Sequence, residues 1–281
     1  MSNDNDEVAP APYVPPPSEA PANEIVAQPW TAPMRWLGLG WRDLRVCPGI
    51  SLFYGLTFWG MAVILGAVFR DRPEFTMTII SGCLLVGPFL AMGLYDASRR
   101  CELNLKPSFT ASTTCWKRHL RSMGLLVGVL IVLELLWGRA SLVIIAVFFN
   151  TGMPSSVGVL QAVFNPQNWE FVIAYLLVGS VFAMLVYATS AVSIPMILDR
   201  DTDAITACIA SIAVVLTNTG VMLLWGALIV VLTSAALMLP WALGLVVVGP
   251  LLGHATWHAY RASVRWLQDA ELGYASGHQT E

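Results

Sequence analysis

The chain has 281 residues, of which 56% are hydrophobic and only 12% are charged. Soluble domains carry about 25% charged residues, so this composition excludes an ordinary soluble domain and predicts one membrane-embedded unit. The formal net charge of -3 does not point to nucleic acid as a partner, and the five cysteines include no Cys-x-x-Cys pair that would indicate a disulfide framework or a thiolate metal site.

The N-terminal residues 1–33 are rich in Pro and Ala and contain no sustained apolar run, which is typical of a disordered or polyproline II tail. This start is acidic and lacks the basic region of a secretory signal, so no cleaved peptide is expected. We therefore expect a cytoplasmic tail over residues 1–33, a membrane-embedded helical domain over residues 34–267 and a flexible tail over residues 268–281.

Four shorter segments are expected to form helices beside the spans. Residues 34–46 combine tryptophans with three arginines, which suits a helix lying at the membrane interface. Residues 107–116 and 204–216 are long enough for short amphipathic helices in cytoplasmic connections, and residues 157–164 for another in an outer loop. All four are predicted to lie at or near the membrane surface.

Apolar runs predict the number of membrane crossings. A spanning helix needs about 20 mostly apolar residues to cross a hydrocarbon core of about 30 Å. Only Leu239 and Pro240 separate the last two runs, so a single bent segment is the alternative there, but the combined length favours two crossings. The predicted fold is an all-α bundle of about six spans in three hairpins: residues 50–69, 76–95, 123–149, 171–198, 221–238 and 241–260.

The distribution of Lys and Arg predicts the orientation, because cytoplasmic loops retain positive charge. With both termini in the cytoplasm, most basic residues lie inside and only Arg70 and Arg72 lie outside. The long loop over residues 150–169 contains neither Lys nor Arg, as an exported loop should. The reverse orientation would export most of the basic residues, so we expect a multi-pass protein with both ends in the cytoplasm.

Three prolines suggest an internal repeat, because each lies in the second helix of a predicted hairpin. Proline inside a spanning helix removes a backbone donor and kinks the helix. Both a true duplication and a simple packing device are compatible with this pattern. Pro88, Pro195 and Pro250 are followed four residues later by Met92, Asp199 and His254, and eight residues later by Asp96, Asp203 and His258.

The two histidines form the first candidate site. His254 and His258 are spaced i and i+4, so both could bind one divalent metal ion or face a haem, with Asp96 and Asp203 converging on them at a cytoplasmic mouth. The structural alternative is that both histidines hydrogen-bond headgroups, water and loop carbonyls at the interface. No Glu completes a His-Glu-x-x-His motif, so no cofactor is predicted and haem or metal binding remains the alternative.

Glu134 and Arg139 form the second candidate site, inside the third span. A charge at mid-bilayer costs about 2.5 to 3.5 kcal/mol on insertion scales, so Glu134 should face the bundle interior. A separation of five residues is poor for pairing within one helix. Arg139 could extend outward, leaving Glu134 to Ser180 or Thr189. Two interpretations of the carboxylate are open. It is either a site for protons or cations, or a single buried polar contact that fixes the register of the helices.

Two stretches of the sequence are similar to a known family. The first is residues 40–55, with Gly-Trp-Arg-Asp-Leu and Pro-Gly-Ile-Ser-Leu-Phe-Tyr-Gly, and the second is residues 249–261, with Gly-Pro-Leu-Leu-Gly-His-Ala-Thr-Trp-His-Ala-Tyr-Arg. They resemble the bacterial predicted integral membrane proteins called domain of unknown function 2189. The resemblance would cover about residues 36–267 and implies a multi-span protein of the bacterial inner membrane. Some members are labelled as cytochrome c oxidase components, but this chain lacks the several histidines of a haem and copper centre.

The sequence contains no nucleotide-binding glycine loop, nucleophile elbow or zinc protease motif, which argues against an enzyme. The leading hypothesis is a non-catalytic bundle that acts through helix or lipid contacts. The label given to some family members implies that the bundle associates with respiratory complexes. Its expected partners are membrane lipids and either a second copy or other membrane proteins. A small proton- or cation-linked transporter or channel is the second hypothesis, and a haem or metal protein is the third.

Overall fold

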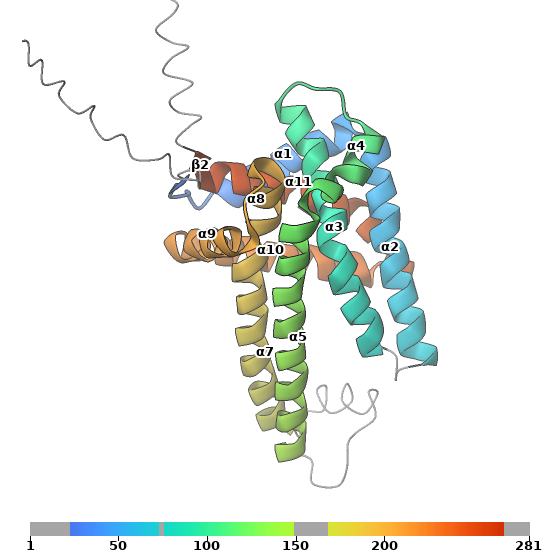
Figure 1. Cartoon of the computed structure of the whole chain (residues 1–281). Coiled ribbons are helices and arrows are strands. Elements are labelled where there is room, and N and C mark those ends of the chain that lie inside the picture. The colour runs from blue at the N-terminus through green and yellow to red at the C-terminus, as the bar shows by residue number, and fades with distance from the viewer. Residues whose placement is uncertain (1–22, 73–75, 149–167, 267–281) are drawn as a thin grey trace, which may run out of the picture. The chain divides into compact units, whose positions relative to one another are not determined.

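The computed structural model describes residues 23–72, 76–148 and 168–266, and within these ranges the chain is almost entirely helical (Figure 1). Residues 25–264 form one compact unit, and the described residues at the two ends belong to another. The elements are β1 (Asn23–Ile25), α1 (Ala32–Val46), α2 (Pro48–Asp71), α3 (Thr76–Glu102), α4 (Phe109–Thr114), η2 (Cys115–His119), α5 (Leu120–Phe148), α7 (Trp169–Ser190), α8 (Ser193–Arg200), α9 (Ala204–Thr217), α10 (Thr219–Met238), η4 (Pro240–Ala242), α11 (Leu245–Ser263) and β2 (Val264–Trp266).

All six predicted spans fall in helical segments, five of them on one helix each and the fourth on α7 and α8, which confirms the all-α membrane bundle. The number of six crossings stays a prediction. The predicted surface helices over residues 34–46, 107–116 and 204–216 correspond to α1, to α4 with η2, and to α9. The predicted outer-loop helix over residues 157–164 lies outside the described residues. Among the described residues, four segments are long and apolar enough to cross a membrane: Pro48–Asp71, Phe109–Phe148, Trp169–Arg200 and Thr219–Met238.

The predicted fourth span is not one continuous helix. Helix α7 ends at Ser190, and α8 begins at Ser193. Pro195 explains the break, because it has no backbone N–H to continue the hydrogen-bond ladder of α7. The hydroxyl of Ser193 donates to the carbonyl of Thr189 and so satisfies part of the interrupted backbone.

Pro88 and Pro250, in contrast, lie inside the continuous helices α3 and α11. The three proline-containing helices α3, α8 and α11 pack against one another. The side chains four residues after the prolines are buried or nearly so: Met92, Asp199 and His254. Their common burial fits the packing role that the proline pattern predicts.

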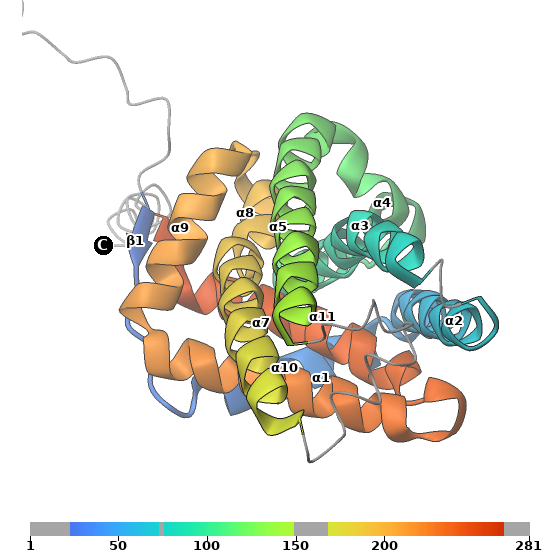
Figure 2. The same cartoon turned by 90° about the horizontal axis from the view of Figure 1, so that it is seen from below.

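Helices α10 and α11 are separate, as the sequence favours, and they run across the direction of α2, α5 and α7 (Figures 1 and 2). Pro240 ends the helical ladder between them, and Trp241 and Ala242 adopt left-handed backbone conformations with φ of 58° and 55°. The backbone of Gly244 then passes against Ala236, where a Cβ atom would lie 2.6 Å from the Ala236 Cα. This tight turn carries α11 back along α1.

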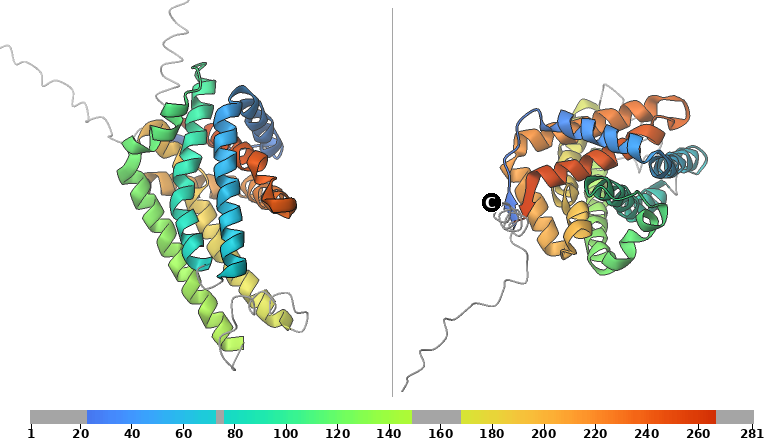
Figure 3. Two further views of the ribbon diagram at one scale, coloured as in Figure 1. Left: turned by 90° about the vertical axis from the view of Figure 1, so that its right-hand side faces the viewer. Right: turned by 90° about the horizontal axis from the view of Figure 1, so that it is seen from above.

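Helix α11 is the central packing partner in the unit, because it contacts α1, α2, α3 and α10. Figure 3 shows α1 lying alongside α11 and the pair α2 and α3 standing next to each other. Glycine permits two of the closest approaches: a Cβ at Gly40 would lie 2.7 Å from the Ala255 nitrogen, and one at Gly55 would lie 2.0 Å from the Val246 oxygen.

Residues 23–33, which the sequence assigns to the N-terminal tail, are described and contact the helices. Gln28 fixes this segment to the helices: its backbone N–H donates to the Asn218 side chain at 2.7 Å, and its side-chain amide donates to the Ala262 carbonyl at 2.7 Å. These contacts satisfy backbone groups that an extended tail would leave to water. Residues 1–22 and the predicted C-terminal tail, residues 268–281, lie outside the described residues.

Candidate functional site

One face of α1 carries a carboxylate into the packed interior. Trp36, Gly40, Asp43 and Cys47 are spaced i, i+4, i+7 and i+11, so they share one side of the helix. All four are buried, and Trp36 packs edge-on against Trp225 of α10 with ring centroids 5.6 Å apart. The packing of the tryptophan and the glycine places Asp43 directly against α11.

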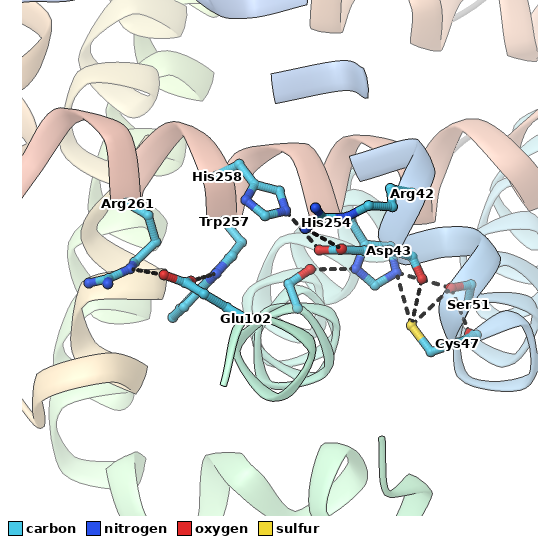
Figure 4. A network of polar contacts seen from close by, with 10 residues as sticks. Arg42, Asp43, Cys47, Ser51, Glu102, His254, Trp257, His258 and Arg261 are labelled. Atoms are coloured by element: carbon cyan, nitrogen blue, oxygen red, sulfur yellow. Dashed lines mark hydrogen bonds and ion pairs between the residues drawn. The ribbon is translucent and has the colours of Figure 1, made fainter. Parts of the chain in front are cut away.

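Asp43 binds His258, the second of the two candidate histidines. The Nε2 atom of His258 lies 2.7 Å from Oδ2 of Asp43, and both residues are buried (Figure 4). Burial disfavours the charged carboxylate, but the hydrogen bond and the charge of His258 outweigh this effect and lower the pKa of Asp43. The carboxylate is therefore ionised and accepts the Nε2 proton of the imidazole.

His254 makes different contacts, between α2 and α3. Its Nδ1 lies 2.7 Å from the Ser98 hydroxyl, and its Nε2 lies 3.0 Å from the Ser51 hydroxyl. Because the Ser51 hydroxyl donates to the Cys47 carbonyl, its oxygen is free to accept from Nε2–H of the ring. Both ring nitrogens of His254 are thus satisfied by hydroxyl groups, which favours a structural role for this side chain.

A second polar group joins the end of α3 to α11. Glu102 accepts hydrogen bonds at 2.9 Å from both the Trp257 indole and the Arg261 guanidinium (Figure 4). Nearby on α8, Asp199 accepts from the Tyr260 hydroxyl at 2.9 Å and from Arg99 at 3.1 Å. Carboxylates from α3 and α8 therefore bind three polar side chains, Trp257, Tyr260 and Arg261, within about one turn near the end of α11.

The predicted aspartates take other positions. Asp96 pairs with Arg100 at 2.9 Å within α3, an ordinary i,i+4 ion pair. Asp203 caps α9 by accepting from the Thr206 backbone N–H at 3.0 Å, and it is exposed. Within the described residues, no hydrogen bond or ion pair joins either aspartate to His254 or His258. The structure therefore joins His258 to Asp43 and His254 to Ser51 and Ser98, rather than either histidine to the predicted aspartates.

Glu134 and Arg139 both lie on α5, where Glu134 is half-buried and Arg139 is exposed. The two hydroxyls proposed as partners of Glu134 bind their own helix instead. Ser180 donates to the Leu177 carbonyl at 2.7 Å, and Thr189 donates to the Leu185 carbonyl at 2.8 Å. Glu134 itself takes part in an interaction within the structure, so it is not an isolated charge.

The candidate histidines were also considered as ligands of a metal ion. In the part of the chain that the structure describes, no group of three or more His, Cys, Asp or Glu side chains is placed to hold a metal ion. The nitrogens of His254 face two serines, whereas His258 faces an aspartate on another helix. Both nitrogens of His254 are occupied by serine hydroxyls, so an ion shared by the two rings would have to displace one of these contacts.

Asp43 is the principal residue that sequence reasoning missed. A signal was available, because it is the only carboxylate between residues 32 and 46 and it falls in register with Trp36 and Gly40 on the apolar face. Ser51 and Ser98 gave no such signal, since hydroxyls are common in apolar helices. Their role depends on α11 crossing between α2 and α3, which local pattern does not predict.

The family comparison concerns the middle of the chain. Residues 76–199, less than half of the 281, match the model of a family described as predicted integral membrane protein (DUF2189). This confirms the family resemblance for α3 to α8, although the two stretches that suggested it lie outside the match. No curated protein and no solved structure matches the chain. With its four long apolar segments, the chain is an integral membrane protein.

Proposed function

From the match of residues 76–199 to a family of predicted integral membrane proteins, we propose that the chain is a non-catalytic component of the bacterial inner membrane. It acts through contacts with lipids and with other membrane helices, from a second copy or from a larger complex such as a respiratory one. Both termini lie in the cytoplasm, in keeping with the distribution of Lys and Arg.

The observation that carries this proposal is the outward face of α5 and α7. Aliphatic side chains on both helices are more than half exposed, an arrangement that costs free energy in water and none in lipid or against another apolar helix. Lipid or a partner must therefore cover this face. The side chains that best represent it are Leu135, Val143, Val147, Leu176, Leu177 and Val181.

The polar groups support a structural rather than a catalytic role. Asp43 and both histidines are buried, and the two nitrogens of His254 are bound by serine hydroxyls. Buried polar groups with fixed partners specify how helices pack. Catalytic groups, in contrast, must reach a substrate from a cleft.

Site-specific photo-crosslinking tests the proposal in intact membranes. A photoreactive residue at Leu177, which is 63% exposed on α7, should form adducts with lipid and with a membrane protein. The same residue at Leu126, which is fully buried on α5, is the matched control and should form neither. Adducts with lipid alone would contradict action through helix contacts, and equal labelling at both positions would contradict the lipid-facing assignment.

A proton- or cation-linked transporter is the second candidate, and the half-burial of Glu134 in an otherwise apolar helix favours it. Reconstituted vesicles can be tested for proton flux with the wild-type chain and with Glu134→Gln. Loss of flux in this variant at an unchanged protein level would replace the non-catalytic proposal. Glu170→Gln, at an exposed position in the first turn of α7, is the control for removing one carboxylate charge.

A further inference from the structure

A pocket of about 400 Å³ lies between the first turns of α1 and the end of α11. It is distinct from the contacts of His254, which are made with Ser51 and Ser98. Its polar and aromatic lining comprises Gln28, Thr31, Arg35, Trp36, His258 and Arg261. No carboxylate is present among the described residues that line it, so the pocket has a positive character.

Arg35 supplies the charge that is not neutralised. It is exposed on α1, and none of the ion pairs among the described residues involves it. Arg261 opposite is already bound to Glu102 through Nε and lies 3.6 Å from Asp199 through Nη1, which fixes the guanidinium in place. Its Nη2 amino group takes part in neither contact and remains able to donate.

His258 adds a polar atom at the pocket wall. Its Nε2 is held by Asp43, whereas its Nδ1 makes no hydrogen bond with the described residues and is not among the buried unsatisfied atoms. The side chain is 9% exposed, and it lines the pocket. With Nε2 bound to Asp43, Nδ1 is the ring nitrogen left to contact a ligand in the pocket.

The backbone contributes in the same direction. Thr31 and Ala32, at the N-terminus of the 15-residue helix α1, also line the pocket. The N-terminal end of a helix carries a partial positive charge, which favours anions. The Ala32 N–H already donates to the Pro29 carbonyl at 2.9 Å and Pro33 has no N–H, so the contribution of α1 is mainly this charge.

Two guanidinium groups, an imidazole and a helix N-terminus thus line one space. Arg261 and His258 are each bound to a carboxylate outside the lining, and Arg35 carries the charge that no carboxylate of the described residues pairs with.

We infer that this pocket binds a phosphate group, carried either by a phospholipid headgroup or by a soluble phosphate ester. Arginine fits phosphate because its planar fork donates two parallel hydrogen bonds to the oxygens. The pocket volume accommodates a phosphate together with part of a glycerol or sugar. The inference goes beyond the proposed function, because it assigns a ligand class that neither lipid-facing helices nor helix contacts require.

The test uses the full chain purified in an uncharged, phosphate-free detergent. One arm titrates inorganic phosphate and glycerol 3-phosphate by calorimetry, and the other measures retained phospholipid by native mass spectrometry. Arg35→Gln should weaken binding at least about tenfold in the arm that shows it, since a charged hydrogen bond is lost. Arg45→Gln is the matched control, because Arg45 is exposed on the same helix and does not line the pocket. Its guanidinium instead lies over the Trp41 ring, 5.0 Å from the ring centroid.

The two arms identify the source of the phosphate group. Saturable binding of inorganic phosphate supports a soluble ester, and stoichiometric phospholipid that is lost in Arg35→Gln supports a headgroup. Arg35→Lys should retain part of the affinity, because the charge stays while the planar fork is removed. Absence of binding in both arms, or an equal loss in Arg35→Gln and Arg45→Gln, would overturn the inference.

Discussion

The contact between α1 and α11 and the contact between α5 and α7 bring helices together in different ways. Between α1 and α11, Gly40 lets the backbones approach, and the bond from Asp43 to His258 fixes their register. Between α5 and α7, Trp137 packs on Tyr175 with ring centroids 5.1 Å apart, and Phe148 packs on Phe171 at 5.8 Å. One contact is polar and close, and the other is aromatic.

The two contacts differ in how much displacement of the helices they tolerate. A buried hydrogen bond to a carboxylate tolerates one geometry, because any shift leaves both partners unsatisfied. Aromatic and aliphatic contacts tolerate small displacements with little loss. We therefore expect substitutions at the α1–α11 contact to cost far more than substitutions on the outward face of α5.

The largest effect is expected for Asp43→Ala. Removing the carboxylate leaves the buried His258 without its partner, so the free energy of unfolding should fall by about 3 to 5 kcal/mol. Denaturation of the purified chain in mixed detergent, followed by circular dichroism, measures this loss. Asp43→Asn keeps the shape and one hydrogen bond, and its loss should be smaller.

Asp203→Ala is the matched control for this substitution. Asp203 is exposed and caps α9, so its removal should cost only about 1 kcal/mol. Equal losses for Asp43→Ala and Asp203→Ala would mean that the buried pair does not specify the packing of α1 on α11. The comparison between the two helix contacts would then fail.

Sequence reasoning located the helices because their cause is local. Hydropathy and the length of the apolar runs predicted helices α2, α3, α5, α10 and α11, and most of their ends fall within about one turn of the prediction. This is possible because the formation of each helix depends mainly on the residues within it. The direction of α10 and α11 was not predictable in this way. It depends on the left-handed turn at Trp241 and Ala242 and on which surfaces α11 meets after it.

The same distinction applies to the candidate site. The spacing of His254 and His258 put both side chains on one helix, but spacing cannot identify partners on other helices. Asp43 precedes His258 by 215 residues, and Ser98 precedes His254 by 156. Their contacts follow from the tertiary packing of α1 and α3 against α11. The spacing of residues along one sequence does not predict which helices pack against each other.

Gly40→Ala should have the next largest effect. The new methyl group would lie 2.7 Å from the Ala255 nitrogen and 2.9 Å from the Leu251 oxygen, so the helices must separate. We expect a net loss of about 1 to 3 kcal/mol in the free energy of unfolding, even though alanine favours the helix. The same detergent denaturation measures it.

Gly38→Ala provides the control on the same helix, two residues away. No atom lies within 4 Å of a Cβ built there, so only the helix preference acts and the variant should gain up to about 1 kcal/mol. If Gly40→Ala also stabilised the chain, α1 and α11 would not be as close as the structure places them.

The smallest effect is expected for Leu135→Ala on the outward face of α5. Leu135 is 63% exposed, and in a membrane its side chain meets lipid or detergent before and after unfolding of the bundle. Its truncation should change the free energy of unfolding by less than about 0.5 kcal/mol. Leu126→Ala, a chemically identical change at a fully buried position of the same helix, should cost about 2 to 5 kcal/mol. A large loss for Leu135→Ala in the purified protein would reveal a partner helix retained on this face, and the loss should then vary with protein concentration, as dissociation of a second copy requires.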